Sequence, residues 1–305
     1  RRYYEVLFLL IILSFFLIGF LGPKFWKISQ PIFNFKSIQY NFSDPVVSVD
    51  RLNQFYSNNN YLSSDQFNNK VVVFRWSENI LNYVKNDIPI PRMYFPYIPK
   101  NISQYETNKK KSVFTAILLP IALRGNELVL EERKQMKIAF STNNIYQIEH
   151  FSKKYKIKNF KKINFSTLNR SELRRIKLEL LNKINSIPIS LILAQSIIES
   201  GWGASRFAQE GNALFGQWTW KNDDGIKPKG NLDANFSVKS FDSLLDSVNS
   251  YILNLNTHPA YKGLRNFRIS QYNTGKNITG NDMANFLDKY AEIGFEYVTK
   301  VKNMI

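Results

Sequence analysis

Residues 189–220 read ISLILAQSIIESGWGASRFAQEGNALFGQWTW, an apolar segment followed by a segment rich in glycine and tryptophan. The apolar part predicts a helix with Ser186 as its N-cap, Pro188 in its first turn and Gly201 at its end. Glu199 then lies in the last turn of this helix. The following segment contains three of the chain's five tryptophans, Trp202, Trp218 and Trp220. A carboxylate beside several aromatic side chains indicates a site that cleaves sugar polymers.

The predicted position of Glu199 favours a raised pKa. The C-terminal end of a helix dipole disfavours an ionised carboxylate, and the apolar neighbours Ile197 and Ile198 disfavour it further by excluding water. A carboxyl group that keeps its proton near neutral pH is suited to be the general acid of a glycosidase. The same position is also that of an ordinary solvated glutamate at a helix end, which is the commoner case.

Short motifs surround Glu199 in a fixed order. They are QxxxESGWG at 195–203, SRFA at 205–208, GNALFG at 211–216, SFDS at 240–243, LNLNTHPAY at 253–261, YAE at 290–292 and GFEYV at 294–298. Together they resemble the glucosaminidase domain of glycoside hydrolase family 73, and in particular its Bax-like bacterial members. The resemblance covers about the last 130 residues. Weaker matches extend it forward to about residue 110, at Phe114, Leu118, Leu119, Pro120, Asn126 and Arg133.

This resemblance implies a lysozyme-like helical fold that hydrolyses the N-acetylglucosaminyl linkage of bacterial cell-wall glycan (peptidoglycan), with Glu199 as general acid. We expect Trp218 and Trp220 to stack on sugar rings, and Trp202 to pack the turn after Glu199 as well. The substrate-binding residues expected around Glu199 are Gln195, Trp202, Phe215, Trp218 and Trp220. Two other functions stay open: a lytic transglycosylase, which uses a similar fold and one glutamate, and a non-catalytic protein that binds or assembles the cell wall.

A second catalytic group is harder to identify. Two-carboxylate glycosidases need a nucleophile or base across the bond from the acid. The resemblance places an acidic residue just before the motif at 238–241, where this chain has Phe236 and Ser237. The remaining candidates are Asp223 and Asp224, which we rank first, followed by Asp233 and Glu292. The N-acetyl group of the substrate is an alternative internal nucleophile, so retaining, inverting and substrate-assisted mechanisms all stay open.

Tyr290 matches the tyrosine of the family's Tyr-Ala-Thr-Asp motif, although Glu292 and Ile293 replace the last two residues. By resemblance Tyr290 lines the cleft and orients the N-acetyl group or a water molecule. A core aromatic residue with a satisfied hydroxyl group is an equally good interpretation.

The first residues predict a membrane attachment. Arg1 and Arg2 precede an apolar run from Val6 to about Gly22, and no small-residue cleavage site follows it. The run is near the short limit for spanning a bilayer and predicts an uncleaved signal anchor at residues 1–23, in the cytoplasmic membrane, with the rest facing the periplasm or cell exterior. A cleaved signal peptide and a buried helix of a soluble protein are the alternatives.

Composition excludes several other chemistries. The chain has no cysteine and only two histidines, so disulfides, thiolate sites and histidine-built metal sites are not expected, and we predict no cofactor. The net charge of +17 is spread along the chain with local runs at 109–111, 153–162 and 174–175. No nucleic-acid recognition motif accompanies these runs, so we expect no nucleic-acid partner. Anionic cell wall or lipid headgroups explain the charge equally well for an anchored protein, and a generic solubilising surface is the alternative for any single run.

The predicted organisation is mainly α-helical. A juxtamembrane spacer or small domain at 24–105 contains a short strand at 71–74, and a catalytic domain at 106–305 contains a small irregular or β-hairpin insert at 217–240. The helices expected in the catalytic domain are 111–123, then 126–140 after a break at Gly125, one capped by Ser171, 241–255, 281–290 and 296–305.

Overall fold

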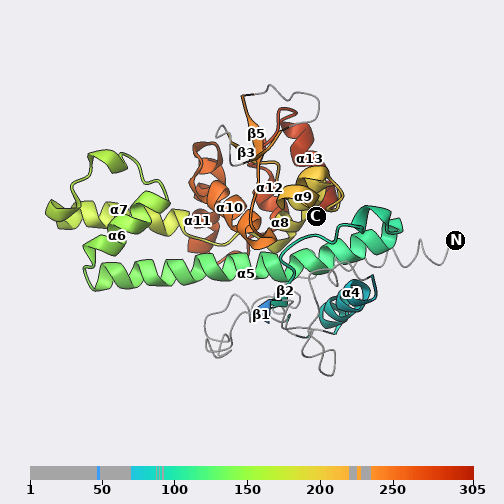
Figure 1. The fold of residues 1–305 in the computed structure, drawn as a ribbon. Helices are drawn as coiled ribbons and strands as arrows, with labels where there is room; N and C mark the ends of the chain where they lie inside the picture. Colours follow the sequence, from blue (N-terminus) through green and yellow to red (C-terminus); the bar gives the residue numbers. More distant parts are fainter. Residues whose placement is uncertain are drawn as a thin grey trace. The chain divides into compact units, whose positions relative to one another are not determined.

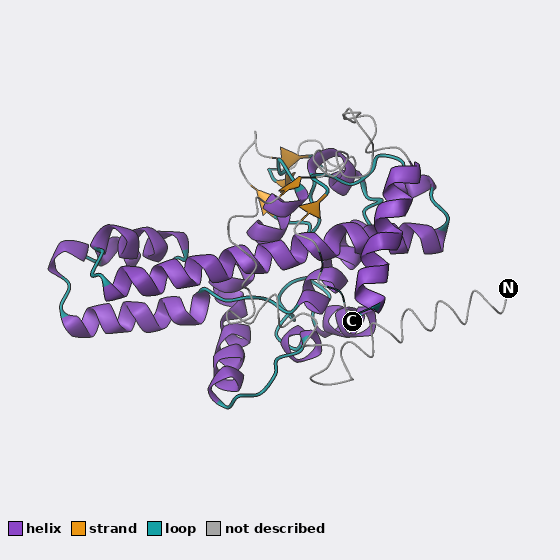
Figure 2. Ribbon diagram, turned by 90° about the horizontal axis from the view of Figure 1, so that it is seen from below, coloured by secondary structure: helices purple, strands orange, loops and turns teal. Residues whose placement is uncertain are grey.

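The computed structural model describes residues 47–48, 70–86, 88, 90, 93–219, 225–227 and 235–305. This part of the chain forms two compact units. The first holds the described residues up to Arg124, together with Ile189–Val248 and Met304–Ile305, and the second holds Gly125–Pro188 and Asn249–Asn303. As predicted, the fold is mainly α-helical with a small antiparallel sheet (Figures 1 and 2). The predicted anchor at 1–23 lies outside the described residues, and the division at 105/106 stays a prediction.

The first unit combines helices with the small sheet. Its helices are α4 (Lys70–Lys85), η2 (Ile102–Gln104), the first half of α5 (Thr107–Ser141), α8 (Ile189–Ser200), α9 (Arg206–Gly211) and the start of α10 (Leu244–Thr257). The sheet has the order β3 (Trp218–Thr219), β5 (Ser237–Lys239), β4 (Gly225–Ile226), and both pairings are antiparallel. The predicted insert is therefore three-stranded. A separate parallel pair joins β1 (Val47–Ser48) to β2 (Met93–Tyr94).

Helix α5 is one long uninterrupted helix (Figure 1). It contains Pro120, and a side chain from α4 compensates for the proline. Proline has no N–H group, so the carbonyl of Ala116, four residues earlier, loses its helical donor. The indole Nε1–H of Trp76 donates to this carbonyl at 3.2 Å, and both residues are buried. Trp76 thus satisfies the backbone group that Pro120 leaves open.

The predictions at 71–74 and at Gly125 were wrong. The predicted strand at 71–74 forms the first turns of α4, whose buried residues Val73, Trp76, Ser77 and Ile80 follow the helical spacing. The predicted break at Gly125 is absent, because α5 continues to Ser141. A glycine inside a helix costs only about 1 kcal/mol relative to alanine, which burial of neighbouring apolar side chains offsets.

The second unit is helical throughout its described residues. Its elements are the second half of α5, α6 (Ile145–Lys154), η3 (Phe160–Lys162), η4 (Phe165–Thr167), α7 (Arg170–Lys183), the rest of α10, η5 (Pro259–Tyr261), α11 (Lys262–Asn273), α12 (Gly280–Ala284) and α13 (Phe295–Met304). Asn169, not Ser171, caps α7, because its side chain accepts from the N–H of Glu172 in a capping box. The helix predicted at 281–290 is limited to the short α12.

Buried polar side chains hold the second unit together by bonding to backbone groups that are not in helical ladders. The amide of Asn126 donates to the carbonyl of Ile187 at 2.6 Å and accepts from its N–H at 2.9 Å. Arg268 donates to the carbonyls of Asn182 at 2.7 Å and Ser186 at 2.9 Å. Burial, with a smaller effect of neighbouring arginines, lowers the pKa of Arg268 to about 9, so the guanidinium is still charged at neutral pH.

Among the described residues, α5 is long and apolar enough to cross a membrane, with a mean hydropathy of 1.6 over its most apolar window. Of that window, 78% is buried inside the structure. A core helix of a globular protein has these properties, and burial accounts for the apolar composition of α5.

We predict that Trp76→Phe lowers the free energy of unfolding, because the carbonyl of Ala116 is left buried without a donor. This effect is about 1–3 kcal/mol and adds to the loss caused by the smaller buried side chain. In a Pro120→Ala background, the introduced alanine supplies the N–H, so the same substitution of Trp76 costs less by this amount. Chemical denaturation of the two single variants and the double variant measures the coupling. Additive effects would show that the indole does not compensate for the proline.

Candidate active site

Glu199 is the penultimate residue of α8 and is half-buried. The helix begins at Ile189, one residue after Pro188, and therefore starts later than the predicted cap at Ser186. Eight of its twelve residues are buried, namely Leu191, Ile192, Leu193, Ala194, Gln195, Ser196, Ile197 and Ser200. Such a helix is held on nearly all sides, so Glu199 projects from a fixed support.

The chain leaves α8 through three consecutive residues with left-handed backbone conformation. Gly201, Trp202 and Gly203 have φ values of +58°, +60° and +73°. The Ser200 hydroxyl spans this turn, since it donates to the carbonyl of Ser196 at 2.6 Å and accepts from the N–H of Gly203 at 2.9 Å. The turn directly after Glu199 is therefore fixed by a side chain as well as by its glycines.

Packing also fixes this turn. A Cβ atom at Gly203 would lie 2.8 Å from the ring of Phe114 in α5, so only glycine fits there. The Trp202 ring meets Phe114 edge-on, with ring centroids 6.2 Å apart. The ammonium of Lys111 lies 5.4 Å from the centre of the Trp202 ring, within cation–π range. Trp202 is half-buried among these contacts, in agreement with its predicted role in packing the turn.

The loop at 211–217 passes beside the Glu199 carboxylate. A Cβ atom at Gly216, which has φ +59°, would lie 3.3 Å from Oε2 of Glu199. The loop is anchored at two points: the Asn212 amide donates to the carbonyl of Phe241 at 2.9 Å, and the Leu214 N–H donates to the hydroxyl of Ser247 at 3.2 Å. Any other residue at this position would place a side-chain atom close against the carboxylate, and glycine avoids this.

Two predicted binding residues lie in the core of the first unit. Gln195 is 0% exposed and lies one turn before Glu199 on α8, and Phe215 is 2% exposed in the loop beside it. Both side chains are therefore part of the core next to Glu199 and are not exposed for contact with substrate.

Aromatic residues of the sheet form an exposed pair. Trp218 on β3 is 55% exposed and stacks on Phe236, with centroids 4.5 Å apart and an interplanar angle of 13°. Next to them, Oε1 of Gln217 is buried and makes no hydrogen bond within the described part of the chain. Sequence reasoning missed Gln217, and no motif marks it. Trp220, Asp223, Asp224 and Asp233 lie outside the described residues.

Tyr290 and Glu292 belong to the second unit. Tyr290 stacks on Tyr297 with centroids 5.2 Å apart and an angle of 6°, and its ring centroid lies 6.3 Å from that of Tyr261. Glu292 is exposed near the N-terminus of α13. Tyr290 is half-buried, so a core aromatic and a residue of the cleft both stay predictions for it.

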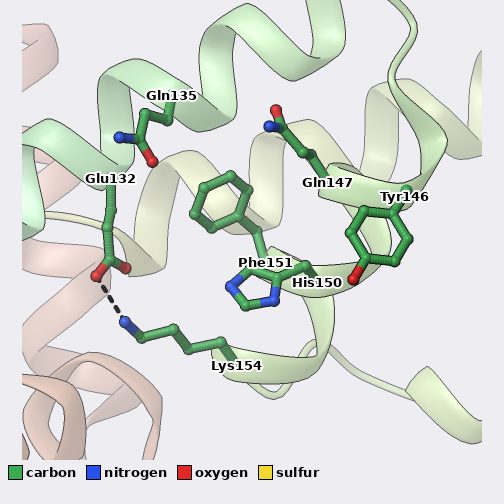
Figure 3. Close-up of a pocket in the computed structure, with 7 residues that line it drawn as sticks. All are labelled: Glu132, Gln135, Tyr146, Gln147, His150, Phe151 and Lys154. Atoms are coloured by element: carbon green, nitrogen blue, oxygen red, sulfur yellow. Dashed lines mark hydrogen bonds and ion pairs between the residues drawn. The ribbon is translucent and has the colours of Figure 1, made fainter.

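A depression of about 390 Å³ lies between α5 and α6 in the second unit (Figure 3). Its lining consists of Glu132, Gln135, Tyr146, Gln147, His150, Phe151 and Lys154. The Glu132 carboxylate accepts from the Lys154 ammonium at 2.5 Å and from the Tyr155 hydroxyl at 2.8 Å. Burial raises the pKa of Tyr155, and the negative charge of Glu132 raises it further. Because both neighbours already use this carboxylate, Glu132 is a poor candidate for the second catalytic group.

No cluster of three or more histidine, cysteine, aspartate or glutamate side chains able to hold a metal ion occurs within the described ranges.

Comparison with known proteins identifies the relationship. Residues 176–305 match the family model described as glucosaminidase, mannosyl-glycoprotein endo-β-N-acetylglucosaminidase. Over 193 residues the chain is 30% identical to Protein bax of Escherichia coli (strain K12), which covers 62% of this chain and 66% of that protein. The chain thus spans slightly less than two thirds of the length of this relative. No solved structure matches the chain.

We predict that Gly203→Ala lowers the free energy of unfolding more than Gly201→Ala does. Both substitutions place alanine in the left-handed region, at a cost of about 1–2 kcal/mol. Only Gly203→Ala also forces a methyl group against Phe114, which adds about 1–3 kcal/mol, because a Cβ at Gly201 has no neighbour within 4 Å. Denaturant unfolding of the two variants gives the difference, and equal losses would contradict the packing argument.

Proposed function

Because the chain contains a glucosaminidase-family domain at residues 176–305 and is a distant homologue of Protein bax, as its motifs predicted, we propose that it cleaves the glycan strands of peptidoglycan at N-acetylglucosaminyl linkages. Membership of this family indicates a glycoside hydrolase, and the expected fold of the catalytic part is lysozyme-like. The observation that carries the proposal is the half-buried Glu199 carboxylate at the end of α8, beside which position 216 carries no side chain.

Glu199 is the proposed general acid. Its carboxyl group protonates the glycosidic oxygen as the bond to the leaving sugar breaks, and partial burial with the helix C-terminus favours the protonated form that this step requires. The rigid turn at 201–203 and the buried helix α8 hold the group in place, so little freedom is lost when substrate binds.

The exposed Trp218–Phe236 pair supports the sugar-binding part of the proposal. Flat aromatic faces bind the apolar faces of sugar rings, and Trp218 is more than half exposed. The unsatisfied amide oxygen of Gln217 would gain a hydrogen bond from a substrate hydroxyl or N-acetyl N–H, which makes it a candidate binding residue. Trp220 lies outside the described residues and, from the sequence alone, is proposed to stack on sugar rings as well.

The second catalytic group is proposed from Asp223 or Asp224, or from the substrate's own N-acetyl group. At the position where the resemblance implies an acid, Phe236 stacks on Trp218 and Ser237 is 2% exposed. This observation also supports the second candidate function, a protein that binds wall glycan without cleaving it. Mass analysis of products from purified glycan distinguishes the functions, because hydrolysis leaves a reducing end, a transglycosylase leaves an anhydro end, and a binding protein leaves no new end.

We further propose the location that the predicted anchor implies, at the cytoplasmic membrane with the catalytic part facing the periplasm or cell exterior, where the glycan is found. Retention of the full chain in the membrane fraction after washing with high salt is the expected result. Recovery of a protein that begins downstream of Gly22 in the soluble fraction would contradict the anchor without affecting the catalytic proposal.

Glu199→Gln is expected to lower the rate of glycan cleavage by about 10²–10⁴-fold or more, because glutamine keeps the shape of glutamate but delivers no proton. Glycan binding and the free energy of unfolding should change little. The matched control is Glu210→Gln in the same unit, an exposed glutamate in an ion pair with Arg206 at 3.1 Å, which is expected to leave the rate unchanged. Comparable activity of Glu199→Gln and wild type would disprove the assigned acid.

A further inference from the structure

Positive charge is concentrated in the second unit. Residues 134–177 contain twelve lysines and arginines but only two acidic residues, an excess of ten in a chain whose net charge is +17. The proposed glycosidase chemistry uses none of these residues. In the sequence the cations of α5 and those of α7 lie far apart, and the fold brings the two helices together.

Helices α5 and α7 lie side by side and antiparallel (Figure 1). Near the end of α7, Arg133 of α5 donates to the carbonyls of Leu181 and Ile184. One turn or more further along α5, the Lys177 ammonium lies 5.8 Å from the centre of the Phe140 ring. Because residue numbers rise along one helix while they fall along the other, these contacts bring Ile138 and Leu178 to the same level of the helix pair.

One outward side of this pair combines cations with exposed apolar side chains. Ile138 is 48% exposed and Leu178 is 56% exposed. On α7, Arg170 and Arg174 lie eight and four residues before Leu178, so they share its side of the helix. Lys137 and Lys177 directly precede Ile138 and Leu178 and border that side. We call this surface the α5–α7 face, and it consists of Lys137, Ile138, Arg170, Arg174, Lys177 and Leu178. The two acidic residues of α7 have other partners: Glu172 belongs to the capping box of Asn169, and Glu179 binds the Lys183 ammonium and the Lys158 N–H.

The cations of the α5–α7 face are close enough to influence one another. Partial burial lowers the pKa of Lys137, and the positive charges of Arg133 and Lys177 lower it further. None of Lys137, Arg170, Arg174 and Lys177 forms an ion pair within the described part of the chain. Crowded like charges without internal counter-ions favour an external anion.

We propose that the α5–α7 face binds a membrane surface rich in anionic lipids. Its lysines and arginines would bind headgroup phosphates, while Ile138 and Leu178 enter the boundary between headgroups and acyl chains. The two exposed apolar side chains favour a lipid surface over a soluble polyanion, because a polyphosphate offers no apolar environment in which to bury them. This inference is independent of the catalytic proposal, since it involves no residue of the candidate active site.

The test compares full-length variants that keep residues 1–23, so that any contribution of the apolar N-terminal run is common to all. Binding is measured to phosphatidylcholine vesicles with and without phosphatidylglycerol. Lys137→Glu with Arg174→Glu should weaken binding to the anionic vesicles by about 30-fold or more, given the usual contribution of each cation near such a surface. The matched control, Lys276→Glu with Lys289→Glu, makes the same charge change at exposed positions of the same unit and should have a much smaller effect.

A second pair of variants separates lipid from soluble polyanion. Ile138→Ser with Leu178→Ser should weaken binding to anionic vesicles while leaving binding to inorganic polyphosphate unchanged. Unaltered vesicle binding by the serine pair would overturn the proposal in favour of a polyanion site. Equal losses for the α5–α7 charge pair and its control would assign binding to net charge alone and would also overturn it. Circular dichroism and thermal unfolding verify that each variant is folded.

Discussion

The Ser200 hydroxyl bridges the end of α8 and the turn that follows, and the position of Glu199 depends on this bridge. Trp202, a bulky residue, is held at φ +60°, which costs about 1–3 kcal/mol. The bond from the Gly203 N–H to Ser200 and the close approach of Gly203 to Phe114 hold the chain in this conformation. Strained backbone conformations are concentrated at functional sites, where they help to hold a side chain in one orientation. The turn therefore connects the packing of the first unit directly to the candidate acid.

Both units use side chains to satisfy backbone groups that helices leave open. Trp76 supplies the donor that Pro120 lacks, Asn126 pairs with both backbone groups of Ile187, and Arg268 covers carbonyls at the end of α7. Each buried carbonyl or N–H left without a partner would cost about 1–3 kcal/mol. These polar contacts thus permit a proline inside α5 and satisfy backbone groups near helix ends. Burial of apolar side chains supplies most of the favourable free energy.

The sequence was sufficient for the helical class, the glucosaminidase match at residues 176–305 and the end of α8, because these follow from periodicity, ordered motifs and glycine positions. It was insufficient at 71–74, where four residues of high strand propensity form part of an amphipathic helix, and at Gly125, where tertiary burial outweighs local propensity. Contacts between residues distant in the sequence could not be predicted from it, for a different reason. The stacking of Trp218 on Phe236 and the assembly of the α5–α7 face depend on strand register and helix pairing, which residue types alone do not encode.

The stacking of Phe236 on Trp218 is relevant to whether Glu199 could cleave the glycosidic bond without a second protein carboxylate. An aromatic residue stands where the resemblance implies an acid, and its ring packs against a neighbour on the adjacent strand. If water attacked with help from a protein base, that base would have to come from the loop between β3 and β4 or from another segment. If the substrate's N-acetyl group attacked, the site would need only to hold this group against the sugar, a task suited to flat aromatic rings and an amide such as Gln217. At this strand an acidic residue is absent and an aromatic stacking surface is present. Substrate assistance explains both features together, whereas a two-carboxylate mechanism explains neither.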